Sequence, residues 1–359
     1  MQRMLRQGTE THSRNAAPGA FLVTHLPHIR YLTGFTGSNA WLLLRSRSAV
    51  LFTDPRYREQ AAAEVRGMRV SIVKGTTFTE ALTALRLHAH LSVLAFEADH
   101  LTATVAANLK RALRPLRMQP VSGLVEFHRM VKGEDEIDRI NRAITISEQA
   151  FMDLLPMLRP GVTEIDIAAE LSYRQRRLGA DGDAFPPIVL FGARTSLIHG
   201  QPSPARLTRR APVLLDFGCR VDGYGSDITR TLHVGPAPRR FREVYDIVRD
   251  AQEAGCAALR AGIEAARVDD IVRGRIANAG WGAYFEHGLG HGIGLETHEA
   301  PHLSWRNGES LEEGQVVTVE PGVYLPGKFG VRIEDDLLVL PDGAECLTTL
   351  PRALLELEP

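Results

Sequence analysis

Five side chains of metal-binding type lie in the second half of this 359-residue sequence, each in a short apolar stretch punctuated by glycine. They are Asp216, Asp227, His291, Glu320 and Glu334, in the segments LLDFGCRVDGYGSDITRT, GLGHGIGLETHE, VVTVEPGVY and GVRIEDD. Carboxylates with one imidazole suit two divalent cations that share bridging ligands, and manganese, cobalt and zinc are all compatible with such a set. Two cations held in this way generate a hydroxide at neutral pH, so the residue types predict hydrolytic chemistry.

The spacing of the two aspartates predicts that they face one another across a hairpin. Asp216 ends the strand VLLD, and Asp227 lies in the strand YGSDITRT. With a four-residue loop over 220–223, an antiparallel ladder sets the two carboxylates directly opposite each other. Like charges in that position destabilise a plain sheet, and a bound cation removes the penalty. We therefore interpret the pair as metal ligands rather than as solvated aspartates at a turn, with Thr229 on the same strand face to orient Asp227.

The two glutamates follow the same logic. Glu320 closes VVTVE, Glu334 lies in VRIED, and the midpoint between them is Gly327 in the turn-rich segment PGVYLPGKFG. A second hairpin can therefore oppose them. Strand alternation puts Arg332 on the same face as Glu334. Arg332 is predicted to neutralise a crowded carboxylate site or to hold substrate, and the alternative is a simple surface cation.

The histidines of this region gather at glycine-rich or strand-edge turns. His291 lies in HGLGHGIG, where glycines allow the backbone to approach a metal or a substrate closely. A phosphate-binding loop is the competing interpretation, but the Lys-Ser/Thr of a P-loop and the dinucleotide-binding spacing are both missing. His199, His287 and His298 lie in similar surroundings. As a group they are predicted to be functional rather than structural.

Composition excludes several classes of protein. The formal net charge is −1 and the sequence pI is about 6.9, which argues against a nucleic-acid-binding or polybasic membrane-binding surface. No apolar run approaches the roughly 18 residues that span a bilayer. The polar first 20 residues give no clear helix pattern and lack the apolar core of a signal peptide. Three widely spaced cysteines form no disulfide framework, so we expect a cytoplasmic protein.

The length predicts two domains, which we assign to residues 1–126 and 127–359. In the first, short strands alternate with helical segments, which indicates a small α/β domain. The boundary is set at the start of an amphipathic helix that begins near 127. The expected elements are strands at 21–24, 70–74 and 91–97, helices at 78–88, 101–113, 163–178, 238–261 and 267–278, and strands from 186 onward.

Together these segments resemble the M24 metallopeptidases of the pita-bread fold, the group of aminopeptidase P, prolidase and methionine aminopeptidase. The likeness over 127–359 rests on the ligand order Asp, Asp, His, Glu, Glu with its gaps of 11 and 14 residues. IRYLTGFTGSNAWLLL and FTDPRYREQA resemble the amino-terminal domain of aminopeptidase P and prolidase, which methionine aminopeptidases lack. Creatinase shares the architecture but lacks the ligands. The resemblance implies an α+β protein, a pita-bread catalytic domain preceded by a smaller α/β creatinase-like domain.

The resemblance also implies roles for the ligands. Asp216 would hold one of two divalent metal ions and His291 the other. Asp227 and Glu334 would bridge both ions. Glu320 would complete the set and carry protons to and from the nucleophilic hydroxide.

Three histidines and one arginine are assigned to the substrate by the same resemblance. His298 would stabilise the oxyanion, and His199 would contact the scissile amide or its leaving nitrogen. His287, His298 and Arg332 would lie on the leaving-group side, where proline is selected.

The predicted reaction removes the first residue from peptides with proline in second position, which makes the protein an Xaa-Pro aminopeptidase. The alternative is an Xaa-Pro dipeptidase, which needs a cation for the free carboxylate of its substrate. Arg306 and Lys328 are the candidates for that cation, and neither forms a convincing clamp in the sequence. A catalytically silent peptide-binding module on the same fold is a remote alternative, because such proteins usually lose ligands.

The resemblance predicts a homodimer, because the amino-terminal domain of these enzymes often supplies a dimer contact. Light scattering at micromolar concentration should give about twice the chain mass of 39.5 kDa. A measured mass of a single chain at that concentration would contradict the prediction.

Overall fold

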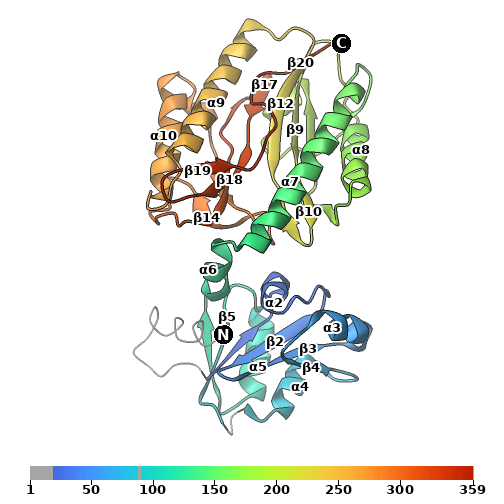
Figure 1. Cartoon of the computed structure of the whole chain (residues 1–359), viewed down its shortest axis with the longest axis vertical. Coiled ribbons are helices and arrows are strands. Elements are labelled where there is room, and N and C mark those ends of the chain that lie inside the picture. The colour runs from blue at the N-terminus through green and yellow to red at the C-terminus, as the bar shows by residue number, and fades with distance from the viewer. Residues whose placement is uncertain (1–18, 88–89, 359) are drawn as a thin grey trace. The chain divides into compact units, whose positions relative to one another are not determined.

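The chain divides into two compact units, Met1–Arg129 and Met130–Pro359. Figure 1 shows the computed structural model, in which residues 19–87 and 90–358 are described. The pattern noted in the first 20 residues therefore falls almost wholly outside the described part of the chain. Among the described residues, no helix is both long enough and apolar enough to cross a membrane.

The first unit is built on a six-stranded mixed sheet in the order β4-β3-β2-β1-β5-β6. Strands β1 to β3 form an antiparallel meander, and β4, β5 and β6 join its two edges in parallel. The strands are β1 Ala20–Val23, β2 Ala40–Arg45, β3 Ser48–Thr53, β4 Arg69–Ile72, β5 Val93–Glu97 and β6 Arg117–Val121.

Helices cover both faces of this sheet, which explains why β1 is apolar throughout. Phe21 and Val23 pack in one core with α2, α3 and α6, whereas Leu22 packs in the opposite core with α4 and α5. The helices are α2 Leu26–Thr33, α3 Arg58–Glu64, α4 Phe78–Ala84, α5 Ala103–Ala112 and α6 Leu124–Met130. The predicted α/β domain is confirmed.

The second unit contains two pairs of helices, α7 with α8 and α9 with α10. Thr163 caps α8 through a reciprocal pair of hydrogen bonds with Asp166, as its position before an acidic first turn suggests. The bounds are α7 Glu134–Leu154, α8 Glu164–Arg177, α9 Arg239–Ala258 and α10 Ala265–Asn278. In Figure 1 these helices flank the strands of the unit.

Each helix pair precedes a set of mainly antiparallel strands, and the last strand, β20, joins β12 in parallel. One sheet has the order β20-β12-β9-β8 and another the order β14-β13-β15-β18-β19, with the hairpin β16-β17 and the small sheet β11-β10-β7 beside them. The strands are β7 Gly182–Asp183, β8 Ile188–Phe191, β9 Ala211–Phe217, β10 Cys219–Val221, β11 Tyr224–Gly225, β12 Ile228–Val234, β13 Gly290–Gly292, β14 Glu299–Leu303, β15 Val316–Val319, β16 Gly322–Leu325, β17 Phe329–Arg332, β18 Asp335–Val339, β19 Ala344–Cys346 and β20 Glu356–Leu357.

The helix expected to begin near 127 is interrupted. Helix α6 ends at Met130, Val131 forms a β-bridge with Gln315, and α7 begins only after Gly133. Gly133 is the N-cap of α7, and its backbone N–H donates to the Glu136 side chain at 2.9 Å. The helical spacing of apolar residues carries no information about this cap, so the sequence predicts one continuous helix where the structure has two.

Candidate active site

The two aspartates do not face each other directly, and the predicted four-residue loop is wrong. Strands β10 and β11 turn through two residues, Asp222 and Gly223, with φ of +48° and +80°. An Asp-Gly pair with both φ angles positive matches the twist of a two-residue hairpin turn. The shorter loop shifts the register, so Asp216 pairs with Thr229. Asp227, two residues earlier, is therefore the diagonal neighbour of Asp216 on the same face.

The register predicted for the two glutamates agrees with the structure. Gly322 pairs with Arg332 in the β16-β17 hairpin, and Val319 pairs with Asp335 in the β15-β18 ladder. Both pairs are symmetric about Gly327, whose φ is +70°. Glu320 and Glu334 lie between the two ladders, where the chains are not paired with each other. The Glu320 N–H donates to Leu289 O at 2.8 Å and the Glu334 N–H to Thr229 O at 3.1 Å.

His291 lies in β13, at a point where three strands crowd together. A Cβ at Gly290 would come within 2.0 Å of Thr318 O, and one at Gly292 within 2.3 Å of Ala300 O. Only glycine fits on either side of His291. The Nδ1 atom lies 3.1 Å from Gly292 O, which favours Nδ1–H as the donor and leaves Nε2 to bind. Nε2 lies 3.4 Å from Glu320 Oε1 and 3.7 Å from Asp227 Oδ2.

All nine site residues named from the sequence line one cavity of about 650 Å³ in the second unit. Asp216, Asp227, His291 and Glu334 are buried in its wall, whereas His199 and His298 are exposed. The nine are His199, Asp216, Asp227, His287, His291, His298, Glu320, Arg332 and Glu334. The cavity also includes Arg306, whereas Lys328 lies in the β16-β17 turn and is not part of the lining.

Crowded buried carboxylates dominate the electrostatics. Burial, with the charges of Glu334 and Asp216, holds the pKa of Asp227 well above its usual range. Burial, with the charges of Glu320 and Asp216, does the same to the pKa of Glu334. The pKa of Glu320 rises to about 8, mainly through burial and despite the opposing charge of Arg332. Without cations the cluster therefore retains protons at neutral pH.

Arg332 is the buried counter-charge at this site, and only 2% of it is exposed. Its Nη2 donates to Asp216 Oδ2 at 2.5 Å and its Nη1 to the Tyr324 hydroxyl at 2.9 Å. The Tyr324 hydroxyl lies 3.0 Å from His287 Nε2, and His287 Nδ1 lies 2.8 Å from Gly288 O. Burial lowers the pKa of His287 to about 4, so its imidazole is neutral, with Nδ1–H donating to Gly288 O and Nε2 accepting from Tyr324.

Three contributors to the site were missed or misassigned from the sequence. Tyr324 was missed, although alternation from Glu320 puts it on the same strand face. Asp336 was missed too, and its Oδ2 accepts the Asp227 N–H at 3.0 Å. The Thr229 hydroxyl donates to Glu334 Oε2 at 2.6 Å instead of to Asp227.

The donor set fits divalent cations. Asp227, His291 and Glu334 each offer a ligand atom, and these atoms all lie within 4.8 Å of one another. Asp216 Oδ1 is buried and has no hydrogen-bond partner among the described residues. In a protein interior, an orphaned carboxylate oxygen beside other carboxylates is stabilised by a cation, or by protonation when no cation is bound. Hard oxygen donors with one imidazole suit manganese, cobalt or zinc.

Comparison with known proteins agrees with this chemistry. Residues 138–341 match the model of metallopeptidase family M24, and residues 11–131 match the creatinase/prolidase N-terminal domain. An Xaa-Pro dipeptidase from Pyrococcus horikoshii is 34% identical over 94% of this chain and 94% of its own length.

Two solved structures are also similar to the chain. An Xaa-Pro dipeptidase from Bacillus anthracis has a TM-score of 0.94 and 38% identity over 99% of both chains. An X-Pro aminopeptidase from Thermotoga maritima has a TM-score of 0.89 and 38% identity, over 94% of this chain and 97% of its own. The chain belongs to metallopeptidase family M24 and is a metallo-exopeptidase, and its predicted pita-bread and creatinase-like domains are confirmed.

The carboxylate cluster predicts an unusual pH dependence for the metal-free protein. Unfolded Glu320 ionises near its ordinary pKa of 4.5, whereas the folded protein keeps the proton to about pH 8. A raised folded-state pKa means that stability is lost as pH rises toward 8, by up to about 1.4 kcal/mol per pH unit for each such group. The pKa of His291 is lowered from 6.5 to about 3, so the titration of His291 changes the stability only at pH values below 6.5.

Thermal unfolding of chelator-treated protein should therefore show a melting temperature that falls as pH rises above 6.5. Adding manganese should flatten the profile, and Glu320→Gln should reduce its slope in the metal-free state. A metal-free melting temperature that stays constant or rises over this interval would show that the carboxylates are not crowded as described.

Proposed function

We propose that this chain is an Xaa-Pro dipeptidase, which hydrolyses the bond before proline in a dipeptide. The observation that carries the proposal is Arg306 in the lining of the same cavity as the carboxylate cluster. A dipeptide carries its free carboxylate one residue beyond the scissile bond, so its binding site needs a cation close to the reacting centre. The dipeptidase names of two of the relatives support the same choice over the aminopeptidase favoured from the sequence.

The surroundings of Arg306 suit a carboxylate ligand. Its side chain is exposed, and its guanidinium lies over the Trp305 ring at 5.4 Å from the centroid. Asn307 also lines the cavity and donates to His302 O at 2.8 Å, which ties the loop back to strand β14. A planar guanidinium with several donors binds a carboxylate through two hydrogen bonds, an arrangement that lysine cannot reproduce.

In this proposal the five sequence-predicted ligands hold two divalent cations. Asp227 and Glu334 would be shared by both ions, Asp216 would serve one of them and His291 the other, and Glu320 would complete the set. When bound, such ions would lower the pKa of water and polarise the scissile carbonyl. The support is the packing of the ligand atoms of Asp227, Glu334 and His291 within 4.8 Å of one another.

The proton-carrying role falls to Glu320. Its pKa of about 8 in the metal-free state shows how strongly the site favours its protonated form. A carboxyl group tuned toward neutral pH accepts a proton from the nucleophile and returns it to the leaving nitrogen efficiently. Cations would draw this pKa down, and burial would hold it above that of an exposed glutamate.

His298 and His199 are proposed to act on the substrate. The centroids of the His298 and His291 rings are 4.2 Å apart. Although part of its surface is exposed, partial burial lowers the pKa of His298 below its usual value, so it is a neutral N–H donor at pH 7. That donor suits an oxyanion. His199 also lines the cavity and is proposed to contact the scissile amide or its leaving nitrogen, to which Glu320 delivers the proton. Proline gives a tertiary amide with no N–H to compete for this contact.

Arg332 and His287 are proposed to select the leaving group. Both line the cavity, and both are joined through the Tyr324 hydroxyl. Arg332 is held by Asp216, so its first effect is to fix the direction of that carboxylate and offset its charge. His287 shapes the wall against which a rigid pyrrolidine ring packs. A ring with φ fixed near −65° loses less conformational entropy on binding than a flexible residue.

An Xaa-Pro aminopeptidase is the second candidate, supported by the similarity to the Thermotoga maritima enzyme. The two activities differ in what lies beyond proline, a free carboxylate or a continuing chain. The homodimer and the cytoplasmic location expected from the sequence remain predictions.

Substrate length separates the two candidates. Ala-Pro should be cleaved at least about tenfold faster than Ala-Pro-Ala, equivalent to roughly 1.4 kcal/mol in the transition state. Arg306→Gln should raise KM for Ala-Pro by about tenfold while leaving Ala-Pro-Ala almost unchanged, because only the dipeptide presents its carboxylate there. Lys328→Gln is the matched control, since Lys328 is a cation outside the cavity lining. Faster cleavage of Ala-Pro-Ala would favour the aminopeptidase, and equal rates on Ala-Ala and Ala-Pro would end the case for proline selectivity.

Metal content and turnover should respond differently to ligand and substrate-contact variants. Asp227→Asn should lose most bound metal as well as activity, because one bridging carboxylate serves both ions. His298→Ala should keep the metal and lose about 10²–10³-fold in kcat, the usual effect of one oxyanion donor. Elemental analysis and Ala-Pro kinetics on the same preparations test both. Full loading of Asp227→Asn would disprove the bridge, and metal loss in His298→Ala would make that histidine a ligand.

A further inference from the structure

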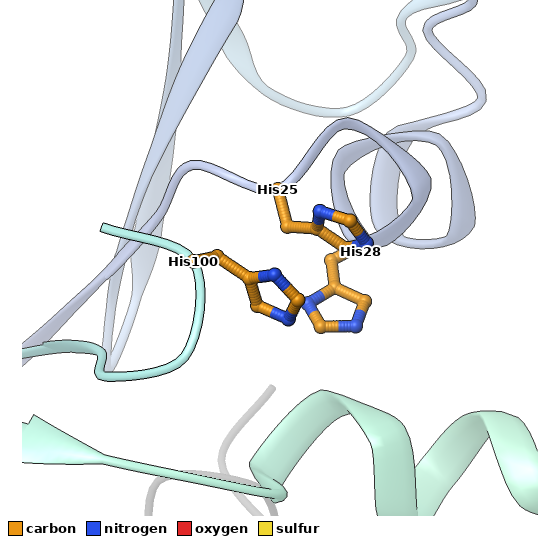
Figure 2. A group of neighbouring side chains, drawn as sticks. All are labelled: His25, His28 and His100. Carbon is orange, nitrogen blue, oxygen red and sulfur yellow. The ribbon is translucent and has the colours of Figure 1, made fainter. Parts of the chain in front are cut away.

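A second group of metal-binding side chains lies in the first unit. His25, His28 and His100 each offer a ring nitrogen, and these atoms all lie within 4.8 Å of one another. Figure 2 shows the three imidazoles gathered together, His25 and His28 from the start of α2 and His100 from the turn after β5. The His25 and His100 rings stack at 3.7 Å between centroids, and the His28 ring stands edge-on to both.

The hydrogen bonds of Glu97 fix the tautomer of His28. Glu97 Oε1 lies 2.5 Å from His28 Nδ1, and Oε2 accepts the Thr24 and His25 backbone N–H groups at 2.6 and 2.9 Å. Because Glu97 Oε2 accepts two backbone N–H groups, Oε1 is left to accept the His28 Nδ1–H. A carboxylate that holds one nitrogen of a histidine while the other faces a metal is a common arrangement in metal sites.

The other nitrogen of His28 lacks a partner. The residue is fully buried, and its Nε2 makes no hydrogen bond within the described part of the chain. It is directed toward Glu126 Oε1 at 3.7 Å, and His100 Nε2 lies 3.2 Å from the same oxygen. If Nδ1 alone carried a proton, the His28 Nε2 lone pair would face the Glu126 carboxylate oxygen with no donor between the two atoms. Such a gap is costly in a buried site unless a cation or an extra proton fills it.

We propose that His25, His28, His100 and Glu126 form a binding site for a divalent transition metal, with zinc as the best match. Imidazole is a preferred zinc ligand, and four-coordinate sites with bonds of about 2.0–2.2 Å place neighbouring ligand atoms roughly 3.3 Å apart. The separations of 3.2 and 3.7 Å between Glu126 Oε1 and the two histidine nitrogens are close to that value.

Charge balance supports a dication. The cluster holds two carboxylates, Glu97 and Glu126, and three imidazoles that bind metals in their neutral form. A divalent cation makes the sum zero. Calcium and magnesium prefer oxygen ligands, so a site dominated by ring nitrogens selects against them.

The ligands come from three segments that are distant in sequence. His25 and His28 belong to the start of α2, His100 to the turn between β5 and α5, and Glu126 to α6. A metal bound by all of them would join these segments across the first unit. The ion would thus be structural and independent of the carboxylate site of the second unit, since none of its ligands lines that cavity.

Metal content of the full-length protein tests the site. Chelator-treated protein, reloaded with zinc and freed of excess, should bind one more ion per chain than His28→Gln or His100→Gln. The control is His90→Gln, an exposed histidine of the same unit outside the cluster, which should bind as much as the parent. Ala-Pro cleavage should persist in all three variants. If the proposed peptidase function is wrong, the parent protein will not cleave Ala-Pro, and Asp227→Asn will not lose metal, whatever the zinc content of the histidine variants.

Two further measurements keep the test decisive. Glu97→Gln should weaken zinc binding at the site by about 10–100-fold, the usual effect of losing the carboxylate behind a histidine ligand. If His28→Gln does not fold, His100→Gln decides, because its side chain is 25% exposed and tolerates replacement. Equal zinc content in the parent and the folded variants would overturn the proposal and leave a hydrogen-bonded cluster with an extra proton on His28.

Discussion

Mutual repulsion among buried carboxylates is the constraint on which the second unit depends. Asp227 and Glu334 are nearly inaccessible to water, and their neighbours Asp216 and Glu320 carry the same charge. One buried arginine, Arg332, offsets part of this charge through Asp216. Removing a partner from such a group leaves an uncompensated charge in the interior, which costs several kcal/mol. The site is thus poorly stable by itself and well suited to cations.

The surrounding strands hold the carboxylates against this repulsion. Glu320 and Glu334 lie between the β15-β18 and β16-β17 ladders, where the two chains are not paired with each other. Their backbone N–H groups instead donate to Leu289 O and Thr229 O. Thr229 holds the Glu334 carboxylate through its hydroxyl, and Asp336 holds the backbone N–H of Asp227. Rigid support of this kind keeps ligands in place before any cation arrives, which limits the entropy lost on binding.

The histidine cluster of the first unit differs from the carboxylate site in its donor atoms but resembles it in how its histidine is oriented. Imidazoles dominate there, and Glu97 fixes the tautomer of His28 much as the Gly292 carbonyl fixes that of His291. In both places one ring nitrogen is tied to an acceptor, so the other is presented to the centre of the group. The difference in donors, nitrogen in one unit and mainly oxygen in the other, would give the two sites different preferences among metals.

The sequence by itself determined the family, the two domain types and nine of the residues that line the cavity, because ligand type, order and spacing are local properties. It also gave the register of Glu320 and Glu334, since a turn symmetric about Gly327 fixes a hairpin from short-range information alone. The predicted loop over 220–223 was wrong, because Asp222-Gly223 alone forms the turn. The partners of Thr229, Tyr324 and Arg332, and the meeting of His28 with His100 and Glu126, were decided only by the tertiary structure. Those contacts join segments distant in sequence, and no periodicity within one segment records which other segment will pack against it.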